Sequence, residues 1–111
     1  MSGDASSEYA IEYDRSARSD LRSIYRYVSF KLNSPRAAKR LYGKLVKQIN
    51  KLNEFPARHR VVDWEPWHTR ELRRMPVENY TVYYRVIEEK LLVTIFRVLY
   101  RGRSAEELFE Q

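Results

Sequence analysis

The chain has 111 residues and a formal net charge of +6, because 21 lysines and arginines outnumber 15 aspartates and glutamates. This length suits one compact domain, and a hydrophobic content of 43% is typical of a globular protein rather than a disordered one. The absence of cysteine excludes disulfides, thiol catalysis and thiolate metal sites. With His59 and His68 as the only histidines, the sequence predicts neither a bound metal nor a cofactor.

The first eight residues, MSGDASSE, are small and polar. We expect them to form a flexible tail ahead of a single folded domain at residues 9–111. They lack the basic and apolar regions of a secretory signal, and no stretch of the chain is apolar enough to span a bilayer. These features favour a cytoplasmic protein without a membrane partner.

The first half of the folded part predicts a strand followed by two helices. Tyr9, Ile11 and Tyr13 alternate as in a short strand, and Asp14 suits the N-cap of a helix. That helix would bury a stripe of residues at helical spacing: Ala17, Leu21, Ile24, Tyr25, Val28 and Leu32. A break at residues 33–35 has Ser34 as the next cap and Pro35 in the first turn. The second helix, ended by Pro56, would bury Ala38, Leu41, Tyr42, Leu45, Ile49 and Leu52.

The opposite face of the second helix is basic. It carries Arg36, Lys39, Arg40, Lys44, Lys47 and Lys51. A solvated surface is one interpretation of this pattern. Contact with nucleic acid or with an acidic protein is the other, since a basic chain attracts polyanions through long-range electrostatics.

Three strands are predicted in the second half, at residues 70–77, 80–87 and 91–101. The irregular segment before them contains Trp64 and Trp67, which we interpret as lids over the core, and Glu65. The final segment, SAEELFEQ, is expected to form a helical turn. The order predicts an α+β fold with an N-terminal strand, a helical hairpin and a three-stranded antiparallel meander, whose helices pack on one face of a small sheet.

Alternation divides the last two strands into faces. In the first of them, Tyr80, Val82, Tyr84 and Val86 oppose Thr81, Tyr83, Arg85 and Ile87. In the second, Thr94, Phe96, Val98 and Tyr100 oppose Val93, Ile95, Arg97, Leu99 and Arg101. Because an unpaired arginine is costly to bury, the arginine-bearing sides are expected to share one open face. Arg85, Arg97, Arg101 and Arg103 beside an exposed Tyr83 would suit a nucleic acid or another negatively charged target, although a polar sheet face explains the same pattern.

The segments RRMPVENYTVYYRV and LLVTIFRVLYRGRS resemble the paired strands of the RelE/ParE superfamily, the toxins of bacterial type II toxin–antitoxin modules, especially the ParE-like branch. The first half matches in pattern, with the SPRAAKRL restart and the FP stop. The resemblance implies a growth-inhibiting toxin of the plasmid-stabilisation type, neutralised by an acidic antitoxin in a hetero-oligomer. It makes the basic helix face the expected antitoxin contact, at Arg36, Lys39, Arg40, Lys44 and Lys47.

Within the superfamily, the resemblance implies two activities. RelE-like members cleave ribosome-bound mRNA without a metal, and on this branch Arg101, Arg74 or Arg73, Tyr100 and Glu65 would form the catalytic set. However, Thr81 stands where these nucleases carry an arginine, and Leu99 where one subgroup carries a histidine. These departures favour the ParE-like interpretation, a protein that binds DNA gyrase and is not an enzyme. An mRNA endoribonuclease and a non-toxic relative that only binds its antitoxin remain the alternatives.

Overall fold

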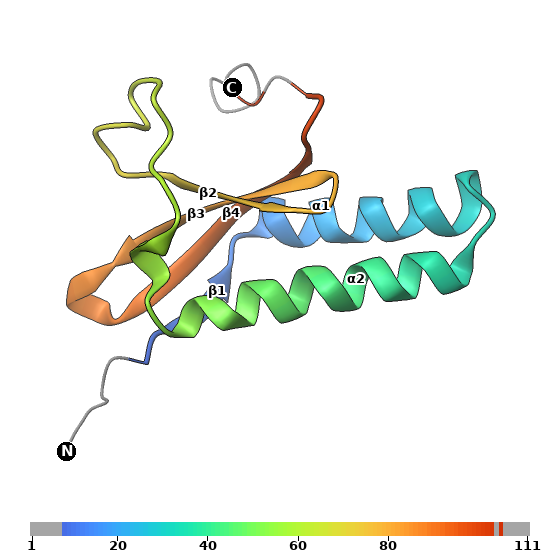
Figure 1. The fold of residues 1–111 in the computed structure, drawn as a ribbon, viewed down its shortest axis with the longest axis horizontal. Helices are drawn as coiled ribbons and strands as arrows, with labels where there is room; N and C mark the ends of the chain where they lie inside the picture. Colours follow the sequence, from blue (N-terminus) through green and yellow to red (C-terminus); the bar gives the residue numbers. More distant parts are fainter. Residues whose placement is uncertain (1–7, 104, 106–111) are drawn as a thin grey trace.

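The computed structural model describes residues 8–103 and 105, which form a layer of helices on a small sheet (Figure 1). The strands are β1 (Ala10–Tyr13), β2 (Arg73–Val77), β3 (Tyr80–Ile87) and β4 (Leu92–Tyr100), and the long helices are α1 (Arg15–Arg26) and α2 (Pro35–Asn50). A π-helical turn, Tyr27–Lys31, continues α1, and 3-10 turns occupy Lys51–Asn53, Pro56–Arg58 and Glu88–Lys90. The expected N-terminal tail lies almost wholly outside the described residues, as does most of the expected C-terminal helical turn.

The sheet has the strand order β1-β4-β3-β2. β2, β3 and β4 pair antiparallel as the predicted meander, whereas β1 pairs parallel with β4. The connection between these two parallel strands is long, as a parallel pair requires, and runs through the helical hairpin, β2 and β3. The predicted α+β architecture is confirmed, and the parallel placement of β1 completes it.

Both predicted helix caps are present. The Asp14 carboxylate accepts a hydrogen bond from the Ser16 N–H at 3.2 Å, and the Ser34 hydroxyl oxygen accepts one from the Ala37 N–H at 3.3 Å. The predicted end of the second helix at Pro56 is wrong, because regular α-helix stops at Asn50 and a 3-10 turn follows. Tyr25, Leu32 and Tyr42, predicted to be buried, are exposed. Leu32 lies at the tip of the hairpin, which projects past the end of the sheet (Figure 1).

The main core lies between the helices and one face of the sheet. Leu45 and Ile49 of α2 pack with Tyr84, Val93 and Ile95, all fully or almost fully buried. Tyr84 also donates a hydrogen bond from its hydroxyl to the Pro56 carbonyl oxygen at 2.6 Å. This hydrogen bond joins the segment after α2 to the sheet. Burial raises the pKa of Tyr84 to about 12.

Replacing Tyr84 with phenylalanine is expected to lower the free energy of unfolding by about 1–2 kcal/mol, because the Pro56 carbonyl loses a buried donor. Since the folded pKa of Tyr84 lies above its unfolded value of 10.0, its contribution is complete below pH 10 and is lost as pH rises towards 12. Urea unfolding at pH 7 and pH 11 measures both effects. A difference between the two proteins that does not shrink at pH 11 would contradict the assignment.

β4 contains a bulge at Phe96, since Tyr84 pairs with Ile95 while Tyr83 pairs with Arg97. The extra residue shifts the alternation by one position. Val93, Ile95 and Val98 consequently face the helices, whereas Phe96 and Leu99 pack on the opposite side. The predicted division of β4 is therefore wrong, because a strict period of two allows for no bulge. The predicted division of β3 agrees with the packing of its core residues.

The face of the sheet away from the helices is not open as predicted. The segment between Pro56 and β2 folds over it (Figure 1), and Val62, Leu72, Tyr83 and Leu99 form a second buried cluster. Trp64 and Trp67 pack against this cluster, so they act as lids on the second core and not on the main one. Tyr83, expected to be exposed, is only 9% exposed.

Candidate functional site

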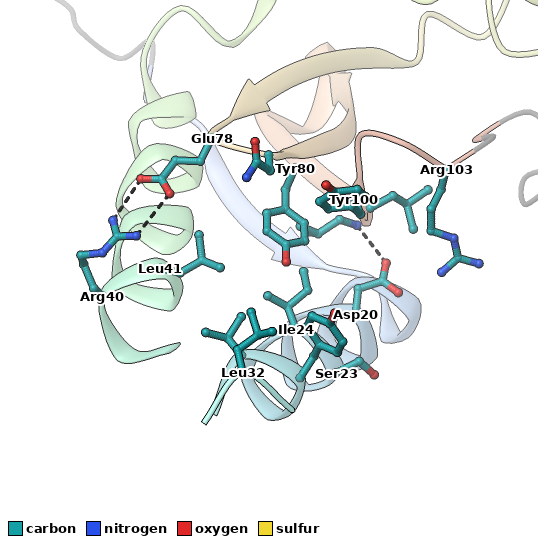
Figure 2. A pocket seen from close by; sticks show the side chains of 15 residues that line it. Asp20, Ser23, Ile24, Leu32, Arg40, Leu41, Glu78, Tyr80, Tyr100 and Arg103 are labelled. Carbon is teal, nitrogen blue, oxygen red and sulfur yellow. Dashed lines mark hydrogen bonds and ion pairs between the residues drawn. The ribbon is translucent and has the colours of Figure 1, made fainter. Parts of the chain in front are cut away.

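A groove of about 720 Å³ lies where the helical hairpin meets the end of the sheet (Figure 2). It is lined by the end of α1 and the turn after it, the first half of α2, the β2–β3 turn, and the end of β4 with the residues after it. Its apolar lining comes mainly from Ile24, Val28, Leu32 and Leu41, and from the rings of Tyr80 and Tyr100. These two rings meet edge to face, with 5.7 Å between their centroids.

Asp20 holds one side of this groove together. Its carboxylate accepts hydrogen bonds from Nε and Nη2 of Arg97, at 2.8 and 2.9 Å, and from the Val98 N–H at 2.8 Å. The hydrogen bond with Asp20 raises the pKa of Arg97. β1 pairs with β4 only as far as Ile95, so the Asp20 carboxylate takes over a backbone donor where that pairing stops. Arg97, predicted as a target contact, thus joins α1 to the sheet.

Glu78, in the β2–β3 turn, binds two of the predicted antitoxin contacts. Its carboxylate lies 3.1 Å from Nη1 of Arg40 and 3.4 Å from Nζ of Lys44, and Figure 2 shows the first pair at the edge of the groove. The hydrogen bond from Arg40 lowers the pKa of Glu78. The other three predicted contacts, Arg36, Lys39 and Lys47, are exposed, with no ion pair to any described residue.

The predicted phosphate-binding arginines do not form one cluster. Arg73 donates from Nη1 to the carbonyl oxygens of Ala57 and His59, at 3.2 and 2.6 Å, and therefore positions the segment after Pro56. Arg85 donates from Nε to the Arg70 carbonyl oxygen at 2.8 Å, which ties the covering segment to β3. Three other arginines are exposed and form no side-chain ion pair within the described part of the chain: Arg74, Arg101 and Arg103.

Glu65 is occupied by a local contact. Its two carboxylate oxygens accept hydrogen bonds from the backbone N–H and the hydroxyl of Thr69, each at 3.0 Å. These bonds, the backbone one first, lower the pKa of Glu65. A general base works best with a pKa near the operating pH, so this arrangement makes Glu65 a weaker base than an ordinary glutamate.

Thr69→Ala is expected to raise the pKa of Glu65 towards its ordinary value, because the hydroxyl donor is lost while the backbone donor stays. A lowered folded pKa adds stability above the unfolded value of 4.5, and that stability disappears as pH falls through the folded value. The variant should therefore lose less stability than the parent between pH 5 and pH 3. NMR titration of the Glu65 side chain measures the pKa directly, with Ser19→Ala as a control, and an unchanged pKa would exclude the hydroxyl contribution.

Thr81 and Leu99 lie directly opposite one another in the β3–β4 register. They are only 5% and 4% exposed, and Leu99 belongs to the second cluster with Val62 and Leu72. The two positions at which the resemblance places a nuclease arginine and histidine are thus neighbours. In this chain they are packed as core.

Residues 11–105 match the family model described as the ParE toxin of the type II toxin–antitoxin system parDE. The chain belongs to the ParE toxin family. The expected membership of the RelE/ParE superfamily is thereby confirmed, and the match extends over most of the folded part. No curated protein matches the chain in sequence.

Solved structures with the same fold include both branches of the superfamily. The chromosomal ParDE system of P. aeruginosa matches with 22% identity and a TM-score of 0.66, over 86% of this chain and 98% of that one. The RelBE2 toxin–antitoxin complex of Mycobacterium tuberculosis matches with 20% identity and a TM-score of 0.66, over 91% and 100% of the two chains. A mutant of the E. coli toxin RelE in the free state has 18% identity and a TM-score of 0.64, over 93% and 92%. At these identities the likeness describes the fold, which ParE-family and RelE-family chains share.

Two general features accompany this ParE-family fold. Within residues 8–103 and 105, no three acidic or histidine side chains are grouped so that they could hold a metal ion. None of the helices in this part of the chain has the length and apolar character needed to cross a membrane.

Proposed function

We propose that this ParE-family toxin inhibits growth by binding DNA gyrase and catalyses no reaction. The observation that carries the proposal is the burial of Thr81 and Leu99, which lie opposite one another on β3 and β4. A transition-state contact must reach the reacting phosphate, and these two side chains are neither charged nor accessible. The lowered pKa of Glu65 further weakens the nuclease alternative.

The target contact in this proposal is the exposed end of the sheet. Tyr100, Arg101 and Arg103 are all exposed there, and Figure 2 shows Arg103 at the border of the groove, on the side of Asp20. Arginine and tyrosine are enriched where protein interfaces gain most of their binding energy. Three residues were predicted as further contacts: Arg85, Arg97 and Tyr83. In the free chain the two arginines form hydrogen bonds within the fold and Tyr83 is buried, so all three would hold the contact surface in place rather than touch the target.

The proposed partner in the resting cell is an acidic antitoxin, bound in the groove of the toxin to form a cytoplasmic hetero-oligomer. Apolar side chains of the antitoxin would pack on Ile24, Leu41 and the Tyr80–Tyr100 pair. Its carboxylates would replace Glu78 beside Arg40 and Lys44. The ParDE and RelBE2 structures show that this fold occurs in toxin–antitoxin systems.

A ribosome-dependent mRNA endoribonuclease is the second candidate function. Its support is the exposure of Arg74, Tyr100 and Arg101, three members of the expected catalytic set. In such an enzyme these residues would stabilise the charge that develops on the scissile phosphate.

Induction of the full-length chain in cells, with two readouts, distinguishes these functions. The proposal predicts filamentation and gyrase-linked DNA breaks while mRNA stays intact. Arg101→Ala/Arg103→Ala should abolish both effects, whereas the matched double variant Arg60→Ala/Lys90→Ala should keep them. Rapid mRNA cleavage inside translated codons would overturn the proposal in favour of the nuclease. Normal growth despite soluble expression would favour a chain that only binds its antitoxin.

A further inference from the structure

The positive charge of this chain is concentrated in its helical layer. Residues 15–51 contain eleven lysines and arginines and one acidic residue, Asp20, a formal charge of +10. Because the whole chain carries +6, the remaining residues carry a formal charge of −4. Asp20 is turned towards Arg97 and Val98 at the edge of the sheet, so it does not neutralise the outer side of the helices.

Arginines line one side of α1 in a continuous row. Arg15, Arg18, Arg22 and Arg26 recur at spacings of three and four residues, which places them on one helix face, and all four are exposed. Within the described residues they form no ion pair. This row lies outside every contact that the toxin assignment uses.

The row borders a shallow groove between the two helices. This groove, of about 420 Å³, is lined by Arg18 and Arg22 of α1 and by Tyr42, Val46 and Asn50 of α2. Lys39 and Lys47 each lie three residues before one of these α2 positions, on the adjoining side of the helix, and both are exposed. The groove is therefore bordered by cations on both helices.

This arrangement is locally unfavourable for the isolated helices. Neither α1 nor α2 has an acidic residue in its first turn, and Asp14, the N-cap of α1, is the one carboxylate beside Arg15 at that helix start. A cation near a helix N-terminus opposes the helix dipole by about 0.3–1 kcal/mol, and like charges four residues apart add a further cost. A polyanion lying along this surface would offset both.

We propose that the outer face of the α1–α2 layer binds the phosphate backbone of duplex DNA. Packed helices lie about 8–10 Å apart, which is comparable to the width of about 12 Å of the major groove of B-form DNA. The α1 row, about 16 Å long at the rise of an α-helix, lies along the phosphates of one strand at the edge of this groove. Lys39 and Lys47 then approach the other strand.

The aromatic residues beside these cations favour a duplex over a single strand. Tyr25 and Tyr42 meet edge to face, at a centroid distance of 6.0 Å and an angle of 87°. The two rings are therefore not parallel, unlike a platform on which successive unpaired bases would stack. Because the proposed contacts are to phosphates and not to bases, DNA binding is independent of base sequence. This DNA binding goes beyond the gyrase proposal and needs no gyrase.

Fluorescence anisotropy of the full-length chain with a 20-base-pair duplex of random sequence, over a range of salt concentrations, tests this surface. Each lost phosphate contact reduces the slope of log affinity against log salt by about 0.9. Arg18→Gln/Arg22→Gln should therefore flatten the slope by about 1.8, whereas the matched variant Arg60→Gln/Lys90→Gln should leave it unchanged. Equal slopes for the two double variants would overturn the proposal.

Two further arms identify the occupant. Stronger binding to single-stranded DNA or to an RNA duplex of the same length than to the DNA duplex would overturn the proposal. The same holds if Arg18→Gln/Arg22→Gln weakens binding of the acidic antitoxin but not of DNA, because the surface would then belong to the antitoxin. Because these assays contain no gyrase, a failure here is separate from a failure of the proposed target.

Discussion

Replacing Asp20 with alanine is expected to lower the free energy of unfolding by about 2–4 kcal/mol, an estimate from buried charged hydrogen bonds and broken ion pairs. The Asp20 carboxylate satisfies Arg97 and the Val98 N–H, and the side chains of the ion pair are only 14% and 23% exposed. Without it, a partly buried guanidinium and a backbone donor at the edge of β4 lose their acceptor. Urea unfolding of the purified variant measures this cost.

Two controls separate the ion pair from general effects on α1. Ser19→Ala, an exposed neighbour on the same helix, should change stability by no more than about 0.5 kcal/mol. The double variant Asp20→Ala/Arg97→Ala should lose much less stability than the sum of the losses in the two single variants. The reason is that Arg97→Ala removes the charge that Asp20→Ala leaves unpaired. Additive costs would show that Asp20 and Arg97 act independently, against the geometry.

Leu99→His, which supplies the residue type expected in one nuclease subgroup, should destabilise the fold by about 2–4 kcal/mol and should not produce mRNA cleavage. Leu99 packs with Val62, Leu72 and Tyr83 in the second cluster. A polar imidazole ring at this position would be buried away from water, and the apolar packing of the leucine would be lost. Leu99→Met, which conserves volume, should cost less than about 1.5 kcal/mol. Thermal unfolding and an mRNA cleavage assay with ribosomes test the two parts.

The second part of this prediction carries the functional argument. If Leu99→His were as stable as the parent and cleaved mRNA, the second cluster would accept a catalytic polar residue and would not be a packed core. The chain would then lie close to the nuclease branch.

Local patterns sufficed for most of the fold. Asp14, Ser34 and Pro35 marked both helix starts, because caps are decided by side chains within a few residues. The meander of the last three strands followed from the order of the predicted elements, and the faces of β3 followed from alternation, whereas the parallel pairing of β1 with β4 was not predicted. The bulge at Phe96 could not be predicted, since an extra residue in β4 is visible only against its partner strand. It moved Ile95 and Phe96 to the faces opposite those expected.

The functional residues were harder to predict because several of the candidates already form hydrogen bonds within the fold of the free chain. Arg73 and Arg97 read as ligand contacts when only strand positions are considered. Their partners are the carbonyl groups of a distant segment and Asp20 of α1, 77 residues earlier. The groove at the hairpin tip combines four separate segments, and no short motif marks it. The α1 arginines carry a signal in the sequence, because Arg15, Arg18, Arg22 and Arg26 recur at helical spacing.

The most direct test of the gyrase proposal is a supercoiling assay with purified gyrase and purified full-length chain, run beside a ribosome-dependent mRNA cleavage assay on the same preparation. We predict dose-dependent loss of supercoiling, sensitivity to Arg101→Ala/Arg103→Ala, and intact mRNA. Full supercoiling activity at every dose, together with cleaved mRNA, would contradict the proposal.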